Sequence, residues 1–306
     1  MNDMNAIRQN SREALNNKSK DYIYIFIHIP KCAGSSINSH ISSRYSQNER
    51  LRLNHKTFGI NIEKSSKMSK ERVAHLVKSM SANQRDSIRI INGHLAYFGI
   101  HELFSNKIPR YFTFIRNPVT RTISHYNFFR SESPARQKFC KVMKNDGGIV
   151  PFEEWLETAV HASNYMVRFC SQSYAGENLH DLDFIVNKEH LEQTKNLLNK
   201  LWFVGLTESR SDMEFIYNRL GVNFYISNKN ISKKYFQPQD YEKTKSLVLS
   251  KNQLDMKLYN YAIDLNQNMI SNINDYNMAV LYTKSVRDIS AFAQKLKRTT
   301  KAWFNR

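Results

Sequence analysis

The chain has 306 residues, enough for one large or two ordinary domains, and 41% of them are hydrophobic, so a sizeable core can form. Its formal net charge of +18 favours anionic partners: nucleic acid, anionic lipid, an acidic polymer or a phosphorylated cofactor. Three widely spaced cysteines argue against a disulfide framework, and no apolar run reaches the ~18 residues of a membrane span. Residues 1–20 lack the apolar core of a signal peptide, so we expect a polar tail and a cytoplasmic protein.

The first strong pattern is YIYIFIHI, Tyr22–Ile29, whose two alternating faces are both apolar. Such a run predicts a strand buried on both sides, as in a parallel sheet. The turn Lys31–Ser36 follows, and Ile37 and Ile41 then recur at helical spacing. Strand, small-residue turn and helix together aim backbone N–H groups at a phosphate. A plain turn with a solvated Lys31 is the alternative interpretation.

A helix is predicted over Ser69–Ser79, with Ser69 as its N-cap. The run Arg89–His94 predicts a short strand that ends in Gly-His. Ligands gather at the strand ends of open α/β sheets, so His94 lies where a general base could act; a structural histidine is the alternative. We also expect His55 in a loop that faces the site, although a surface polar loop is the more common explanation for such a residue.

Tyr111–Ile115 predicts another buried strand, followed by a helix with Asn117 as its N-cap and Pro118 as its first residue. Arg116 lies at the strand end, on the same sheet edge as Lys31, and with Ser124 forms a second plausible phosphate clamp. Arg121 shares a helix face with Ser124. An exposed basic helix start is the alternative.

Together, IPKCAGSS and FIRNPVTRTISHY resemble the two cofactor-binding signatures of carbohydrate sulfotransferases related to heparan sulfate 2-O- and 6-O-sulfotransferases. Those enzymes use 3′-phosphoadenosine 5′-phosphosulfate, PAPS. The resemblance implies that the first segment grips the 5′-phosphosulfate and the second holds the 3′-phosphate. The cofactor-binding residues that it implies are Lys31, Ala33, Gly34, Ser35, Ser36, Arg116, Arg121 and Ser124.

Weaker matches extend the resemblance to about Leu265. Gly93-His94 resembles the Gly-His of the 2-O-sulfotransferases, in which a histidine is the proposed base, although Asn92 replaces a frequent first histidine. Asn164 and Arg168 match the family's Asn-x-x-x-Arg segment. With His55, they are our candidates for acceptor binding.

The predicted fold is α/β: a P-loop-like three-layer domain over residues 21–265, with a central, mainly parallel sheet flanked by helices. A short strand is expected at Asn223–Ile226, and Lys233 and Lys234 follow as candidates for covering the cofactor. Residues 266–306 are predicted to form a helical, basic extension. Its alternation of apolar and basic residues favours either docking on the domain or peripheral contact with the inner face of a membrane.

The predicted activity is transfer of a sulfuryl group from PAPS to a glycan hydroxyl, leaving adenosine 3′,5′-bisphosphate. His94 takes the hydroxyl proton, which requires a pKa near the working pH. Lys31 neutralises charge on the leaving phosphate. No metal and no nucleic acid are expected, because no zinc-type spacing or nucleic-acid motif is present. A nucleotide-dependent kinase and a non-catalytic polyanion binder stay open as alternatives.

Overall fold

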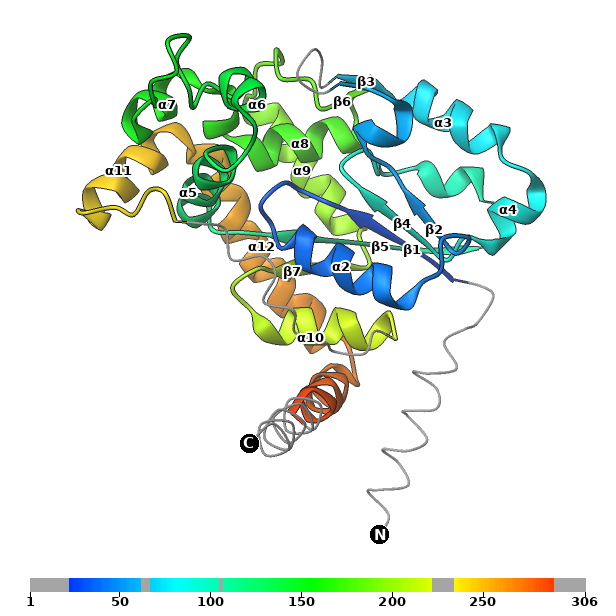
Figure 1. Cartoon of the computed structure of the whole chain (residues 1–306). Helices are drawn as coiled ribbons and strands as arrows, with labels where there is room; N and C mark the ends of the chain where they lie inside the picture. The colour runs from blue at the N-terminus through cyan, green and yellow to red at the C-terminus, as the bar shows by residue number, and fades with distance from the viewer. Residues whose placement is uncertain (1–21, 62–66, 105–106, 222–233, 289–306) are drawn as a thin grey trace, which may run out of the picture.

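A parallel five-stranded sheet forms the centre of the protein in a computed structural model that describes residues 22–61, 67–104, 107–221 and 234–288. Its strand order is β2-β4-β1-β5-β7, and every neighbouring pair runs parallel (Figure 1). The strands are β1 (Tyr22–Ile27), β2 (Arg50–Arg52), β4 (Ile90–Gly93), β5 (Ile108–Ile115) and β7 (Phe203–Leu206).

The middle strand, β1, has almost no exposed surface from Ile23 to Ile27, because β4 and β5 pair with it on either side and helices cover both faces. The prediction of a strand buried on both sides is therefore confirmed. The strand ends at Ile27, two residues earlier than predicted. Beyond it, the carbonyl of His28 accepts a hydrogen bond from the side chain of His94.

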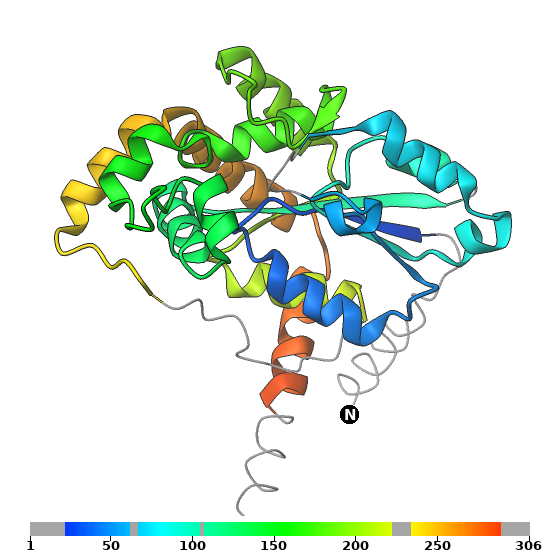
Figure 2. The same cartoon turned by 45° about the horizontal axis from the view of Figure 1, so that its top comes forward.

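Helices lie on both faces of this sheet, which confirms the predicted three-layer α/β class. In Figures 1 and 2, α2 (Gly34–Arg44) and α10 (Arg210–Arg219) lie on one face, and α8 (Tyr165–Tyr174) and α9 (Lys188–Lys200) on the other. At the β2 end lie a two-strand ladder and two further helices: β3 (Met68–Ser69), β6 (Asn178–Leu179), α3 (Lys70–Ser79) and α4 (Ala82–Ser87). Ser69 caps α3, as predicted.

A second helical group with its own core lies beyond the carboxyl ends of the strands (Figure 1). Trp155, fully buried, is its largest member. The helices are α5 (Pro118–Phe129), α6 (Pro134–Phe139), α7 (Phe152–Thr158) and α11 (Tyr241–Lys251). The sequence pattern of residues 137–144 predicts a helix, but only residues 137–139 are helical: α6 ends at Phe139, and Lys141 adopts a φ of 58°, which a right-handed helix cannot continue through.

Two helices far apart in the sequence cap each other. The Asn164 side chain, just before α8, accepts hydrogen bonds from the Leu254 and Asp255 amides at the start of α12 (Gln253–Ser271). The carboxylate of Asp255, fully buried, accepts in return from the amides of Met166 and Val167 in the first turn of α8. Backbone amides in the first turn of a helix have no acceptor within that helix. Here the side chain at the start of each helix supplies the acceptor for amides of the other.

The C-terminal part of the described chain is anchored to α10. Residues 276–288 are helical, and Arg287 forms an ion pair with the buried Glu214. The Tyr276 hydroxyl donates to Asp212 over 2.6 Å. This docking is one of the two alternatives for the extension. Helix α12 runs through residue 265, and the division of the chain there stays a prediction. The predicted tail at 1–20, the strand at Asn223–Ile226, Lys233 and the last residues from 289 on lie outside the described residues.

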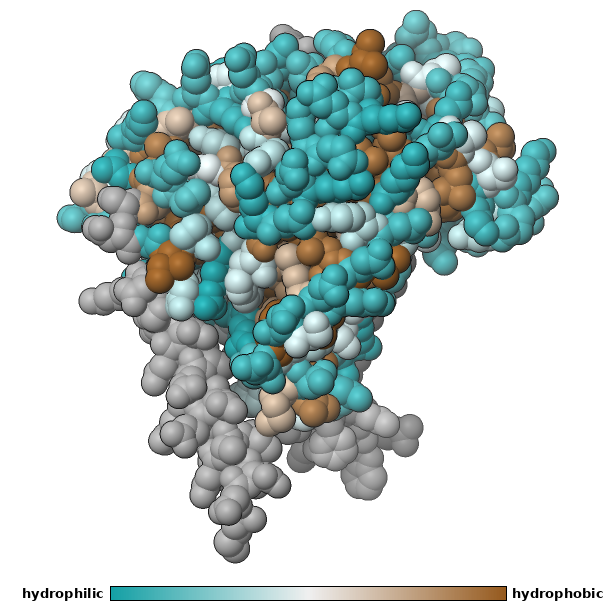
Figure 3. Space-filling model, turned by 180° about the vertical axis from the view of Figure 1, so that it is seen from behind, coloured by the Kyte–Doolittle hydropathy of each residue, from teal (hydrophilic) through white to brown (hydrophobic). Residues whose placement is uncertain are grey.

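Most of the surface seen from behind in Figure 3 is hydrophilic, and hydrophobic side chains form small separate groups there. Scattered apolar side chains of this kind are normal on protein surfaces. Within the described residues, no helix combines the length and the apolar character that crossing a membrane requires.

Replacing Asp255 with alanine should lower the free energy of unfolding by about 1–3 kcal/mol, since two buried amides lose their acceptor. Urea denaturation measures the loss. Asp264→Ala, on an exposed position of the same helix, is the matched control and should change stability little. Equal losses for the two variants would contradict the capping role of Asp255.

Candidate active site

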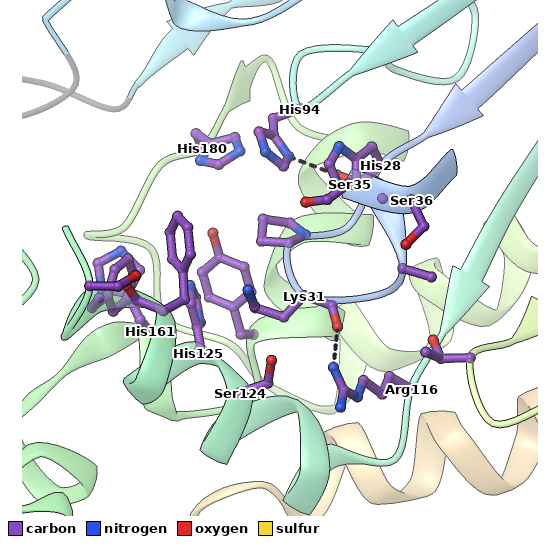
Figure 4. Close-up of a pocket in the computed structure, with 18 of the residues that line it drawn as sticks. His28, Lys31, Ser35, Ser36, His94, Arg116, Ser124, His125, His161 and His180 are labelled. Atoms are coloured by element: carbon purple, nitrogen blue, oxygen red, sulfur yellow. Dashed lines mark hydrogen bonds between the residues drawn. The ribbon is translucent and has the colours of Figure 1, made fainter. Parts of the chain in front are cut away.

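A cavity of about 660 Å³ opens at the carboxyl edge of the sheet. After β1 the chain crosses to β2 on one side of the sheet, and after β5 it crosses to β7 on the other side. The topological switch point of the sheet therefore lies between β1 and β5. Open α/β sheets bind ligands at this point. Lys31 and Arg116, each just past one of the two strands, line the cavity (Figure 4).

The loop after β1 is held in a backbone conformation that is rare for residues other than glycine. Lys31 has a φ of 68° and Ala33 a φ of 58°. The guanidinium of Arg116 donates to the carbonyl of Lys31 over 2.9 Å, which braces the loop. Helix α2 starts at Gly34, with no acidic residue in its first turn, and Gly34, Ser35 and Ser36 line the cavity. The loop can therefore present backbone N–H groups to an anion.

The second loop is fixed from β7. Glu208 accepts a hydrogen bond from the amide of Asn117, which is the N-cap of α5 as its sequence suggests. Thr120 accepts one from the Nε of Arg116 over 3.1 Å. Among the described residues, no carboxylate forms an ion pair with Arg116. Ser124, two turns into α5, lines the cavity as well, so the predicted clamp of Arg116 and Ser124 faces the same space as Lys31.

The ammonium of Lys31 lies 4.3 Å from the centre of the Phe128 ring. Burial, with the nearby charge of Arg116, lowers the pKa of Lys31 to about 8. Both effects disfavour the charged form in the absence of an anion. An anion bound between Lys31 and Arg116 would reverse this balance.

His94, at the end of β4, has a defined tautomer. Its Nδ1 lies 3.0 Å from the carbonyl of His28, which can only accept, so Nδ1 carries the proton and Nε2 is left as an acceptor. Burial lowers the pKa of His94 to about 4. The expectation of a pKa near the working pH is therefore wrong. With the lower pKa, the imidazole of His94 is neutral, and so able to act as a base, over a wider range of pH.

His28 packs between Phe26 and His94, with ring centres 5.2 Å and 4.1 Å away. Its Nδ1 lies 3.3 Å from the side-chain nitrogen of Asn38. The side-chain oxygen of Asn38 in turn accepts a hydrogen bond from the side-chain nitrogen of Asn92 over 2.7 Å. Asn92 thus anchors the ring that stacks on the candidate base. His28 is not among the predicted site residues, although it is the one strongly polar side chain in the first apolar run.

Gly34 is required by this packing. A Cβ atom on Gly34 would lie 1.5 Å from Nε2 of His28. The histidine ring therefore fills the space that a side chain at position 34 would occupy. The absence of a side chain at Gly34 thus makes room for the His28 ring that stacks on His94, and it also leaves the loop backbone open to an anion.

Three more histidines line the cavity: His125, His161 and His180. Burial lowers the pKa of each, to about 3 for His161. His125 is already engaged, because its Nδ1 lies 3.0 Å from the guanidinium of Arg121. Of these three, only His125 could have been predicted as a site residue from the sequence, because it follows Ser124 in the second motif.

Arg121 does not reach the cavity, in contrast to its predicted role as a cofactor ligand. It is fully buried beside His125, and its guanidinium also donates to the carbonyl of His161 over 3.0 Å. A helix face shared with Ser124 did not determine exposure, because His161 and Tyr165, from a distant part of the chain, pack against Arg121. Arg121 thus holds two of the histidines that line the cavity.

The three candidates for acceptor binding lie behind the cavity wall. Asn164 is the cap between α8 and α12, and Arg168 donates to the carbonyls of Leu182 and Phe184. His55, also buried, packs edge-on against His180 at 5.1 Å. None of the three lines the cavity, so their direct contact with an acceptor has no support from the geometry.

Replacing Gly34 with alanine should destabilise the protein by about 1–3 kcal/mol through overpacking against His28. In a His28→Ala background the same change should cost much less, because the space is then open. A double-mutant cycle measured by denaturation quantifies this coupling. Additive effects of the two substitutions would contradict the contact.

Comparison with known proteins agrees with this geometry. The sulfotransferase family matches residues 17–262. The chain is 25% identical over 215 residues to heparan sulfate 2-O-sulfotransferase 1 of Gallus gallus and 23% identical to that of Homo sapiens, matches that cover 66% of this chain. It spans about half the length of these relatives, 55% in both cases. The resemblance carried by the two motifs is confirmed: this chain belongs to the sulfotransferase family.

Proposed function

We propose that this protein transfers a sulfuryl group from PAPS to a hydroxyl of a glycan. The observation that carries the proposal is the meeting of two anion-binding loops and a neutral histidine in one cavity. Lys31 and Arg116 mark places for two phosphate groups, and His94 lies at the far side of the same space (Figure 4). Family membership favours this function over a nucleotide-dependent kinase or a non-catalytic polyanion binder.

The residues present fit such a donor. Among the described residues, no Asp or Glu lines the cavity, whereas Lys31, Arg116 and Arg136 do. PAPS, when bound, supplies the sulfuryl group on its 5′-phosphate. The α2 N-terminus and Lys31 would hold the 5′ group, and Arg116 with Ser124 the 3′-phosphate. The described residues offer no cluster of ligands for a metal, and the absence of a metal stays a prediction.

His94 would remove the acceptor proton. Its Nδ1 proton is held by the His28 carbonyl, so Nε2 is the atom that can accept another. Lys31 would stabilise the charge that grows on the phosphate oxygen as the sulfuryl group leaves. Both groups act on charge that develops in the transition state, so they should affect turnover more than cofactor affinity.

The glycan class of the acceptor is taken from the relatives named above, which are heparan sulfate sulfotransferases. A cytoplasmic location and contact of the C-terminal extension with the inner face of a membrane are further proposals, drawn from the sequence alone.

Transfer of labelled sulfate from PAPS to a panel of glycans tests the function, with His94→Ala as the decisive variant. That variant should lose roughly 10²–10⁴ in turnover, the worth of a general base. Its affinity for adenosine 3′,5′-bisphosphate, measured by calorimetry, should stay near normal. A folded variant that keeps most of the rate would remove His94 from the mechanism, and a wild-type protein that binds ATP with magnesium but not adenosine 3′,5′-bisphosphate would reject the function.

The pH dependence of kcat/KM should be bell-shaped. His94 is competent above its pKa of about 4, and Lys31 is charged below its pKa of about 8, so activity should rise near the first value and fall near the second. In Lys31→Arg the guanidinium stays charged and the alkaline fall should disappear. An acid limb near 6.5, or an unchanged alkaline limb in the variant, would contradict this assignment.

A further inference from the structure

His28 lies between the two parts of the cavity that the proposed reaction has to bring together. Its ring stacks on that of His94, with ring centres 4.1 Å apart, and both residues line the cavity. The Nε2 end of the same ring covers Gly34, the first residue of α2: a Cβ atom there would lie 1.5 Å from Nε2 and 1.9 Å from Cδ2. Figure 4 shows the ring beside His94 and near Ser35. One ring thus joins the candidate base to the start of the helix that is placed to hold the 5′ group.

The hydrogen bonds around His28 place its proton. The side-chain oxygen of Asn38 accepts from Asn92, so the side-chain nitrogen of Asn38 is the atom that faces Nδ1 of His28. An amide nitrogen can only donate, so Nδ1 accepts and the proton of the neutral ring is on Nε2. Burial lowers the pKa of His28 well below its usual value, which keeps the ring neutral. His28 therefore carries one N–H donor, at the end of the ring that covers the start of α2.

His28 and His94 are thus opposite tautomers. In His94 the proton is on Nδ1, bonded to the carbonyl of His28, and Nε2 is an acceptor. In His28 Nε2 is a donor, and no described residue forms a hydrogen bond with it. A donor of this kind suits an oxygen atom that carries negative charge. A sulfuryl group on the 5′-phosphate has three oxygens that share such charge, and it would extend from the α2 loop toward His94, past this N–H.

We propose that Nε2–H of His28 donates a hydrogen bond to an oxygen of the sulfuryl group and holds that group in line between the leaving phosphate and the acceptor. The inference rests on the proposed function. In the transfer, the acceptor oxygen gives its proton to Nε2 of His94 and forms a bond to sulfur. The bond from sulfur to the phosphate oxygen breaks and leaves its electron pair on that oxygen. His28 keeps its proton throughout, so its contribution is orientation of the group that is transferred.

Calorimetry with two ligands tests this role: PAPS without an acceptor, and adenosine 3′,5′-bisphosphate, which lacks the sulfuryl group. His28→Leu removes the N–H and keeps most of the bulk, so it should weaken PAPS binding roughly 10- to 100-fold, the worth of a hydrogen bond to a charged group. Its affinity for adenosine 3′,5′-bisphosphate should stay near that of the wild type. His28→Gln carries an amide N–H close to the same place and should recover part of the PAPS affinity. A role limited to packing against His94 would lower turnover without separating the two ligands.

His101→Leu is the matched control, because His101 also packs against an aromatic ring, that of Tyr111, but does not line the cavity. It should bind both ligands as the wild type does. Equal losses for the two ligands in His28→Leu, or no loss for PAPS, overturn the inference. Nitrogen NMR of the wild type reads the tautomer without any substitution, and a proton on Nδ1 of His28 overturns it as well.

Sulfate transfer by the wild type separates this inference from the proposed function. A wild type that transfers sulfate, together with a His28→Leu variant that keeps full affinity for PAPS, rejects only the role of His28. A wild type that neither binds PAPS nor transfers sulfate rejects the function, and the role of His28 with it.

Discussion

The hydrogen bond from Arg116 to the carbonyl of Lys31 is the contact on which the candidate site depends. Lys31 and Ala33 both adopt positive φ, a conformation that costs non-glycine residues roughly 1–2 kcal/mol each. Strain of this kind persists only where surrounding contacts fix it. The bond ties the loop after β1 to the loop after β5, so the two candidate anion-binding segments hold a fixed separation. A ligand with two phosphates then has little ordering left to impose.

The histidines of the cavity follow from the same packing. Five of the ten in the chain line it, and burial lowers the pKa of all five. Neutral imidazoles add no positive charge to a space that already contains Lys31, Arg116 and Arg136. The positive charge is thus concentrated on groups placed for anions, while His94 keeps a lone pair for a proton. Burial of the histidines thus keeps their rings uncharged and also keeps His94 able to accept a proton.

Sequence reasoning located what depends on local pattern. The two-sided apolar run gave β1, and the small-residue turn and the Asn-Pro start of α5 gave the loops that carry Lys31 and Arg116. It failed where a role depends on distant contacts. Asn164 lies about ninety positions from its partners in α12, and neither periodicity nor spacing reports such a pair. Arg121 carries a charge that normally signals exposure, yet His161 and Tyr165, some forty positions along the chain, pack against it and bury it. His180, on a separate loop, offered no pattern at all.

The close approach of Gly34 and His28 has a consequence for the evolution of the family. The two positions compete for one volume, so a protein cannot carry a large ring at the first and a side chain at the second without moving one of them. Among homologous chains, residues 28 and 34 should therefore vary together. Those with a side chain at position 34 should place at position 28 a residue that is smaller or that points elsewhere. Such chains would have to support the histidine at position 94 by a different neighbour.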